Sequence, residues 1–405
     1  MDEKLPYPTK CPICRGAKLL CGLPYCPLIQ DKISKFRVKH IKTDIVEGIS
    51  SPEVFVGRNN YPSVNVGPLV SLGEAVPGTK SLFGKGIMDI ASLRMGVVRS
   101  KHRVNVRKAI EPDKFLETTQ ELAIASSPAM TEVKFSKSKK FEIPKIDGFY
   151  LPMGPSGNAI KAKIIENTSI PRKVDHITSD TDAPSNTGMM ELYSNGIDND
   201  YIMRILSTGM LGTKLMRKIV PTRWAITAVD DTIGKNLIEK IKDFREIGEY
   251  EVYNGDFAGN YFYIILIPDV WSFEMVECWL KDEAWDSMNN IINDWEGYYG
   301  RKKYADKITG AYYSARLAIT EHLIRRRKQA AALVYREISK EYFIPLGVWV
   351  IRETVRNAMN EKPEKFNTLD ECIDHINEYV NVKNWTQKSH LIEENKTQRK
   401  LFDFR

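Results

Sequence analysis

The chain lacks any apolar run near the roughly 18–20 residues that a membrane-spanning helix needs, and its best run, Tyr261–Pro268, suits one buried strand. It opens Met-Asp-Glu-Lys with no apolar segment behind, so we expect no secretion signal. No Walker loop or Gly-x-Gly-x-x-Gly fingerprint occurs, and Gly154-Pro155-Ser156-Gly157 lacks a Gly-Lys-Ser/Thr ending. These absences argue against a standard nucleoside triphosphatase or dinucleotide enzyme, and we expect a cytoplasmic protein without membrane contact.

The charge is distributed unevenly along the 405 residues. Residues 1–150 contain 24 Lys and Arg against 15 Asp and Glu, a net charge of +9, whereas the remainder has a net charge of −2. Such an asymmetry indicates an anionic partner, most simply nucleic acid, and the alternative is a solvated Lys-rich surface with no partner. The apolar fraction of 42% and charged fraction of 27% are those of a globular protein, for which we predict a mixed α and β fold.

Four of the six cysteines lie within sixteen residues: Cys11, Cys14, Cys21 and Cys26. Clustered thiols in an intracellular chain favour metal over disulfides, and four closed thiolates are the usual ligands of structural zinc. We therefore predict a zinc module over residues 1–30 that the metal folds outright. An iron–sulfur cluster and unliganded thiols remain the alternatives.

Basic residues alternate along Val97–Lys108, where Arg94 to Lys108 includes six Lys and Arg and no acid. Period-two alternation predicts a strand with one cationic face. The residues of that face are Arg99, Lys101, Arg103 and Arg107. A row of cations can follow a phosphate backbone, so these four are candidate DNA-binding residues. The alternative is an edge strand that its charges protect from aggregation.

An Asp pair, Asp180 and Asp182, precedes a predicted helix that ends near Tyr193. In the structural interpretation Asp182 caps this helix and Pro184 occupies its first turn. In the functional interpretation the two carboxylates hold a divalent cation. An Asp-x-Asp spacing alone does not decide between them.

A second acidic pair, Asp230 and Asp231, follows residues 221–229, which resemble a buried strand, and precedes a predicted helix over 233–241. Working side chains often lie at the carboxyl end of a strand in α/β proteins, so the pair is a catalytic candidate together with Arg223. A phosphate ligand would also require a divalent ion or an Arg between the two carboxylates. In the structural alternative one Asp caps the helix and the other pairs with a buried Arg.

The C-terminal part has helical periodicity over residues 305–339 and again over 369–382, with a strand or packed turn predicted for 342–353. We accordingly predict a body over residues 31–304, a mainly helical region over 305–382 and a flexible tail over 383–405.

Large apolar side chains nevertheless stand at the end of this tail, where Gln398, Leu401 and Phe404 follow a Gln-x-x-Leu-x-x-Phe spacing. The spacing places the apolar pair on one side of a single helical turn, as in ligands of sliding clamps. Arg405 occupies the position of the usual second aromatic. The alternative is a tail that folds back on its own protein.

Several segments together resemble the archaeal NreA family of DNA repair proteins over essentially the whole chain. They are the four-cysteine segment, Ser179–Asp182, Gly209–Gly212, Val220–Asp231, Gly347–Trp349 and the terminal Gln-x-x-Leu-x-x-Phe motif. The resemblance implies a role in DNA damage tolerance, a zinc-finger-like N-terminus and association with the sliding clamp PCNA. It implies no catalytic role for Asp230 or Asp231.

The sequence therefore predicts a DNA repair protein that binds PCNA through its C-terminal tail and DNA through its basic N-terminal part. The alternative is a metal-dependent hydrolase or nuclease that uses an Asp/Arg site. RNA binding within translation is a third hypothesis, but it gives no reason for the terminal motif. Whether any reaction is catalysed stays open.

Overall fold

The computed structural model describes residues 42–71, 73–140, 154–280, 291–339, 341–342 and 344–397. These residues form two units, the first ending at Ile233 and the second beginning at Gly234, within helix α9 (Thr222–Ile241). This division differs from the boundaries that we predicted after residues 30, 304 and 382. The difference arises because strands from both sides of residue 304 pair in one sheet.

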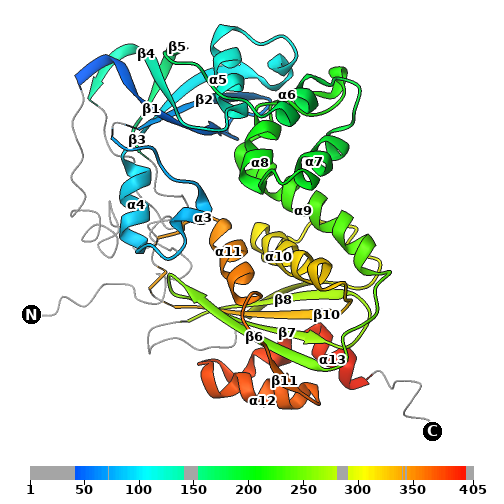
Figure 1. Cartoon of the computed structure of the whole chain (residues 1–405). Helices are drawn as coiled ribbons and strands as arrows, with labels where there is room; N and C mark the ends of the chain where they lie inside the picture. Colours follow the sequence, from blue (N-terminus) through cyan, green and yellow to red (C-terminus); the bar gives the residue numbers. More distant parts are fainter. Residues whose placement is uncertain are drawn as a thin grey trace, which may run out of the picture. The chain divides into compact units, whose positions relative to one another are not determined.

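A closed barrel of five strands, in the order β1-β2-β3-β5-β4, forms the centre of the first unit (Figure 1). Its strands are β1 (Lys42–Val56), β2 (Ser63–Ser71), β3 (Val97–Asn105), β4 (Ala129–Lys140) and β5 (Ser156–Ile164). Strand β3 runs parallel to β5, and all other neighbouring pairs are antiparallel. The register of β1 shifts twice, which bends this long strand so that it pairs with both β2 and β4.

Small apolar side chains fill the barrel, because alternate residues of each strand point inward. The valines of β2 and β3 that belong to its core clusters are Val64, Val66, Val70, Val98 and Val104. Helix α5 (Lys114–Ile124) follows β3, and its Phe115 and Leu116 join two clusters of these buried residues. The alternation leaves the cations of β3 on the outer surface.

Two short helices, α3 (Thr79–Leu82) and α4 (Ile87–Met95), interrupt the connection between β2 and β3. The periodicity of apolar residues predicts a helix over Ile87–Met95 with Gly96 at its end, and the structure confirms both. A 3₁₀ turn, η2 (Val106–Ala109), follows β3. Arg107 therefore lies in this turn and not in the strand that we predicted to reach Lys108.

After the barrel come α6 (Arg172–Ser179), α7 (Ser185–Ser194), α8 (Asn199–Ser207) and the 3₁₀ turn η3 (Lys214–Met216). The prediction that Asp182 caps the helix is wrong, since Pro184 is the N-cap of α7. The carboxylate of Asp180 instead accepts hydrogen bonds from the backbone N–H of Asp182, at 2.8 Å, and of Ala183, at 3.3 Å. Asp180 thus stabilises the turn between two helices.

The predicted strand over 221–229 is wrong, because residues 222–241 form the single helix α9. Its buried residues recur at helical spacing: Ala225, Val229, Ile233, Leu237 and Ile241. This helical period continues through Asp230 and Asp231 without a break. Asp230 and Asp231 therefore lie in the middle of a helix, and no strand end presents them.

The second unit contains a six-stranded sheet in the order β11-β6-β7-β10-β8-β9. Its strands are β6 (Tyr250–Phe257), β7 (Asn260–Ile267), β8 (Ser272–Trp279), β9 (Ile291–Glu296), β10 (Ala331–Ile338) and β11 (Glu364–Phe366). Strand β7 confirms the strand predicted from the apolar run at Tyr261–Pro268. Strand β10 runs parallel to β8, and the remaining neighbours are antiparallel.

Helices cover both faces of this sheet (Figure 1). On one face lie α10 (Gly310–Arg326) and α11 (Trp349–Ala358). On the other lie α12 (Leu369–Tyr379), the 3₁₀ turn η5 (Lys383–Lys388) and α13 (His390–Thr397). The ring of Phe273 on β8 packs 4.9 Å from that of Tyr312 on α10, and Tyr335 on β10 stacks 4.5 Å from Trp385 on η5.

The prediction of one long helix over 305–339 is wrong in its second half. Helix α10 ends at Arg326, because Arg327 adopts the left-handed conformation with φ of 53°. Strand β10 follows and is buried along its whole length, so it lacks the alternation that identifies a half-exposed strand. The strand or turn predicted for 342–353 is also partly wrong, since α11 begins at Trp349. The helix predicted over 369–382 is confirmed by α12.

The flexible tail predicted from Lys383 is wrong as far as Thr397, because η5 and α13 pack against the sheet. Trp385, Leu391 and Ile392 are buried there. A buried carboxylate of the sheet holds the backbone of this segment: Glu274 accepts hydrogen bonds from the N–H groups of His390 and Leu391. Acceptors that lie far away in the sequence leave no sign in the tail's own pattern.

Two predicted sites lie outside the described residues. They are the four cysteines of the zinc module and the motif formed by Gln398, Leu401 and Phe404. Among the described helices, none is both long and apolar enough to cross a membrane.

Candidate nucleic-acid interface

The outer face of β3 carries the predicted cations Arg99, Lys101 and Arg103. Arg103 is exposed, whereas Arg99 and Lys101 are half-buried, and the alternating residues Val98 and Val104 point into the barrel core. Strand β3 pairs with β2 on one side and β5 on the other, so it is not an edge strand. The alternative that its charges protect an exposed edge is therefore wrong.

Neighbouring groups orient these cations on the barrel surface. The Nε of Arg99 donates to the carbonyl of Gly154 at 3.3 Å, and its Cζ lies 5.5 Å from the ring centre of Phe55 on β1. Burial lowers the pKa of Arg99, but an arginine so placed still carries its charge near neutral pH. The Nε of Arg103 donates to the Ser63 hydroxyl at 3.0 Å, where β2 begins.

The remaining basic residues of this stretch differ in their surroundings. Arg107 is exposed, and its backbone N–H donates to Asn105 as the chain leaves β3. His102 pairs instead with Asp113 at 2.8 Å and stacks on Phe115, with ring centres 4.6 Å apart. Burial opposes ionisation of Asp113, but hydrogen bonds from His102 and from the start of α5 outweigh burial and lower its pKa. His102 is thus part of the packing of α5.

An exposed aromatic pair lies where the β1–β2 loop meets the first turn of α9. The rings of Tyr61 and Trp224 have centres 5.1 Å apart and are inclined at 53°, and the two residues are 47% and 44% exposed. The backbone N–H of Val56, at the end of β1, donates to the hydroxyl of Thr222 at 2.9 Å. This bond ties the helix to the barrel strand that leads into the loop.

The sequence analysis missed this pair, because it assigned no role to Tyr61 and placed Trp224 in a buried strand. The sequence did contain one sign of this pair: in both the β1–β2 loop and the start of α9, an aromatic residue lies close to an arginine. Arg58 precedes Tyr61 by three positions, Arg223 precedes Trp224 directly, and both arginines are exposed. Aromatic and cationic side chains together are typical of nucleic-acid surfaces.

The two predicted acidic sites have local structural roles. Asp230 is buried, and the Nδ2 of Asn199 on α8 lies 3.5 Å from its carboxylate. Arg223 lies two helical turns earlier on α9, which corresponds to about 10 Å along the helix axis. Asp231 is half-buried on the same helix.

The loop with Asp180, Thr181 and Asp182 binds instead to residues 212–217. The N–H of Lys214 donates to the carbonyl of Thr181 at 2.8 Å, and Arg217 donates to the carbonyl of Asp180. Among the described residues, no group of three or more His, Cys, Asp or Glu could hold a metal ion. The acidic residues thus have hydrogen-bonding partners but no described metal-ligand set.

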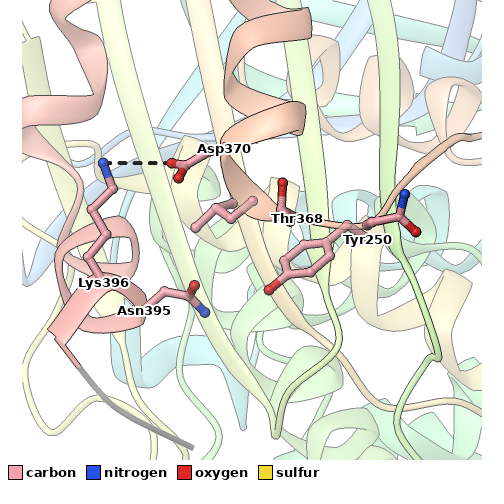
Figure 2. Close-up of a pocket in the computed structure, with 7 residues that line it drawn as sticks. Tyr250, Thr368, Asp370, Asn395 and Lys396 are labelled. Carbon is pink, nitrogen blue, oxygen red and sulfur yellow. Dashed lines mark ion pairs between the residues drawn. The ribbon is translucent and has the colours of Figure 1, made fainter. Parts of the chain in front are cut away.

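The second unit has a pocket of about 360 Å³ near the end of α13 (Figure 2). It is lined by Tyr250 at the start of β6, residues 367–370 at the start of α12, and Asn395 and Lys396 of α13. The Nζ of Lys396 lies 3.8 Å from the carboxylate of Asp370, which links the two helices. Burial raises the pKa of Tyr250. None of the site residues predicted from the sequence lines this pocket.

Models of two protein domains match almost the whole chain. The archaeal Nre N-terminal domain matches residues 20–286, and the archaeal Nre C-terminal domain matches residues 296–404. The chain belongs to the archaeal Nre family. The interval between the two matches, residues 287–295, includes most of β9, so the second unit includes parts of both family domains.

Named members of the Nre family resemble the chain along nearly all of their length. It is 37% identical over 382 residues to the DNA repair protein NreA of Archaeoglobus fulgidus, covering 93% of this chain and 95% of the relative. It is 36% identical over 406 residues to NreB of the same organism, at 97% and 99% coverage. The DNA repair protein NreA of Haloferax volcanii is 34% identical over 370 residues, at 87% and 88% coverage. No solved structure matches this Nre chain.

Proposed function

We propose that this Nre protein acts in DNA repair, contacts DNA through the outer face of β3 and binds the sliding clamp PCNA through its C-terminal motif. The relatives that match it over most of their length bear the name of DNA repair proteins. Their names support the repair role.

The observation that carries the DNA contact is the row of cations on a barrel strand. Arg99, Lys101 and Arg103 point outward from β3 because the alternate residues are committed to the core. Pairing with β2, and with β5 at Arg99 and Lys101, holds this row in place, and the phosphates of a nucleic-acid backbone attract it. Arg107 extends the positive charge beyond the strand. The net charge of +9 in residues 1–150 favours the same polarity.

The zinc module and the clamp motif belong to the same proposal. Four thiolates at Cys11, Cys14, Cys21 and Cys26 are a complete ligand set for structural zinc. The apolar pair Leu401 and Phe404, with Gln398 one turn before, has the spacing that a clamp pocket accepts.

The dependence of DNA affinity on salt tests the contact at β3. Replacing Lys101 and Arg103 together by Ser removes two cations, so the slope of log affinity against log salt should fall by about two. The double variant Lys302→Ser, Lys303→Ser removes two exposed charges in the second unit and is the matched control. An unchanged slope in the β3 variant would exclude this face as the contact.

A further inference from the structure

The topology of the barrel indicates which form of nucleic acid it suits. Its strand order β1-β2-β3-β5-β4, with β3 parallel to β5 and helix α5 between β3 and β4, is the topology of an oligonucleotide/oligosaccharide-binding fold. In that fold the outer face of strands 2 and 3 and the loop between strands 1 and 2 bind oligonucleotides. The cations of β3 lie on that face, and Tyr61 lies in that loop, where its ring contacts Trp224 of α9.

We propose that the barrel binds single-stranded DNA, with its phosphates along β3 and an unpaired base against the Tyr61–Trp224 pair. The inference rests on the proposed function, because it specifies the form of DNA that the same face contacts.

The row of cations on β3 reaches the start of β2, close in sequence to Tyr61. Arg103 lies opposite Asn65 in the register of β2 and β3, and Arg99 lies opposite Leu69. The hydrogen bond from Arg103 to Ser63 then connects the row to the start of β2, two residues after Tyr61. From Arg99 to Arg103 the row extends about 13 Å along the strand. A DNA strand whose phosphates follow these cations would therefore reach the loop that contains Tyr61.

The aromatic pair accounts for the preference for a single strand. Both rings are nearly half exposed although each contacts the other, so ring surface remains available to a ligand. Bases stack on exposed aromatic side chains, and such stacking contributes about 1–3 kcal/mol per base. In a duplex the faces of the bases are already stacked on one another, so only an unpaired base can use these rings.

Arginines beside the pair add the charge that this contact requires. Arg58 is exposed in the same loop as Tyr61, and Arg223 is exposed next to Trp224. The bond from Val56 to Thr222 holds the loop and the helix together, so both arginines accompany the rings. These charges complement a phosphate on either side of a stacked base.

Binding by the full-length protein to a fluorescein-labelled oligothymidylate, measured by anisotropy, tests the inference. A duplex and an RNA oligomer of equal length serve as comparison ligands. We expect Trp224→Ala to weaken single-strand binding about tenfold and to leave duplex binding unchanged, whereas Trp224→Phe retains most of the affinity. Tyr299→Ala is the matched control, because Tyr299 is 95% exposed in the second unit.

The outcomes separate the inference from the proposed function. If Trp224→Ala and Trp224→Phe both bind oligothymidylate like the parent while Lys101→Ser, Arg103→Ser binds weakly, the cations contact DNA and the stacking inference fails. If neither change weakens binding, both proposals fail. Tighter binding to duplex or to RNA than to single-stranded DNA also overturns the inference. Equal thermal melting of the parent, Trp224→Ala and Trp224→Phe establishes that lost affinity is not lost folding.

Discussion

The carboxylate of Glu274, buried in the sheet of the second unit, accepts a hydrogen bond of 2.8 Å from the backbone N–H of Leu391. It also accepts from the backbone of His390 and from the hydroxyl of Ser389. One side chain therefore satisfies the first N–H groups of α13, which have no partner inside the helix. The carboxylate and the start of α13 stabilise each other, since a negative charge at a helix N-terminus is favourable.

Replacement of Glu274 by Ala should detach α13 from the sheet. The substitution leaves buried backbone donors without an acceptor, at about 1–3 kcal/mol each, so we expect the unfolding free energy to fall by about 3 kcal/mol. Hydrogen exchange of the amides in residues 389–397 measures the detachment directly. Asn293→Ala removes only a single donor to the same carboxylate and is the control. Exchange that stays as slow as in the parent would contradict this anchoring role.

Acid should destabilise the second unit through His322. Burial first, and then the charges of Arg326 and Arg325, lower the pKa of His322 from 6.5 to about 4, while Glu251 opposes them. The unfolded chain therefore binds a proton between these values that the folded protein excludes. The stability that neutral His322 contributes should be fully present above pH 6.5. The unfolding free energy should then decline by up to about 3 kcal/mol as the pH falls to about 4.

Urea unfolding at several pH values measures this dependence. His322→Gln keeps a polar side chain but cannot titrate, so its stability should change less between pH 6.5 and 4. The hydroxyl of Tyr253 lies 3.3 Å from the His322 ring, and Tyr253→Phe is the control that retains the titrating group. Parallel pH curves for the parent and His322→Gln would show that another group is responsible.

The double change Leu401→Ala, Phe404→Ala should abolish capture of the protein by PCNA. In the proposed contact the apolar pair would supply the buried surface and Gln398 a hydrogen bond, so Gln398→Ala should weaken capture without abolishing it. The melting temperature should stay within about 1 °C, because the proposal assigns the apolar pair to the clamp pocket and not to this protein's own core. Arg399→Ala is a control between the motif residues. Full capture of the double variant would place the contact elsewhere.

The four cysteines should hold one zinc ion per chain, measurable by elemental analysis of the purified protein. Replacing Cys11 and Cys14 by Ser should release the metal, since two remaining thiolates cannot close a tetrahedral site. The buried residues Cys278 and Cys372 belong to the sheet core of the second unit, so Cys278→Ala should retain the metal. Iron in place of zinc would favour the cluster alternative.

The hydrolase alternative predicts a different response at α9. If Asp231 and Asp230 are structural, Asp230→Asn should lower the unfolding free energy by about 1–2 kcal/mol, because it changes a buried polar contact. Asp231→Asn should leave both DNA binding and any divalent-metal-dependent cleavage unchanged. A cleavage activity in the parent that disappears in Asp231→Asn, with unchanged melting, would instead support the enzyme.

The sequence predicted those elements whose own residues determine them. The helix over Ile87–Met95 and its end at Gly96 follow from local periodicity and from a glycine. The outward cations of β3 follow from alternation, which holds wherever one face of a strand is buried. The zinc ligands and the clamp motif rest on spacing alone and lie outside the described residues, so they stay predictions.

The errors arose where distant residues decide the structure. The β-branched run at the start of α9 suits a strand, and only the buried positions that continue to Ile241 identify a helix. Strand β10 is covered on both faces, so its apolar run lacks a distinguishing period. The site was incomplete for a similar reason: Tyr61 and Trp224 are far apart in the sequence, and only the folded barrel brings their rings together.

The end of α13 at Thr397 has a geometric consequence for binding to a ring-shaped clamp. Four residue steps separate Thr397 from Leu401, and even a fully extended chain covers only about 14 Å over that length. A flexible tail from Lys383, as predicted from the sequence, would have let the protein move freely around its attachment point on the clamp. With so short a connection, the proposed docking of the terminal motif would hold the second unit against the clamp's surface, where it would compete for space with ligands on the adjoining subunits.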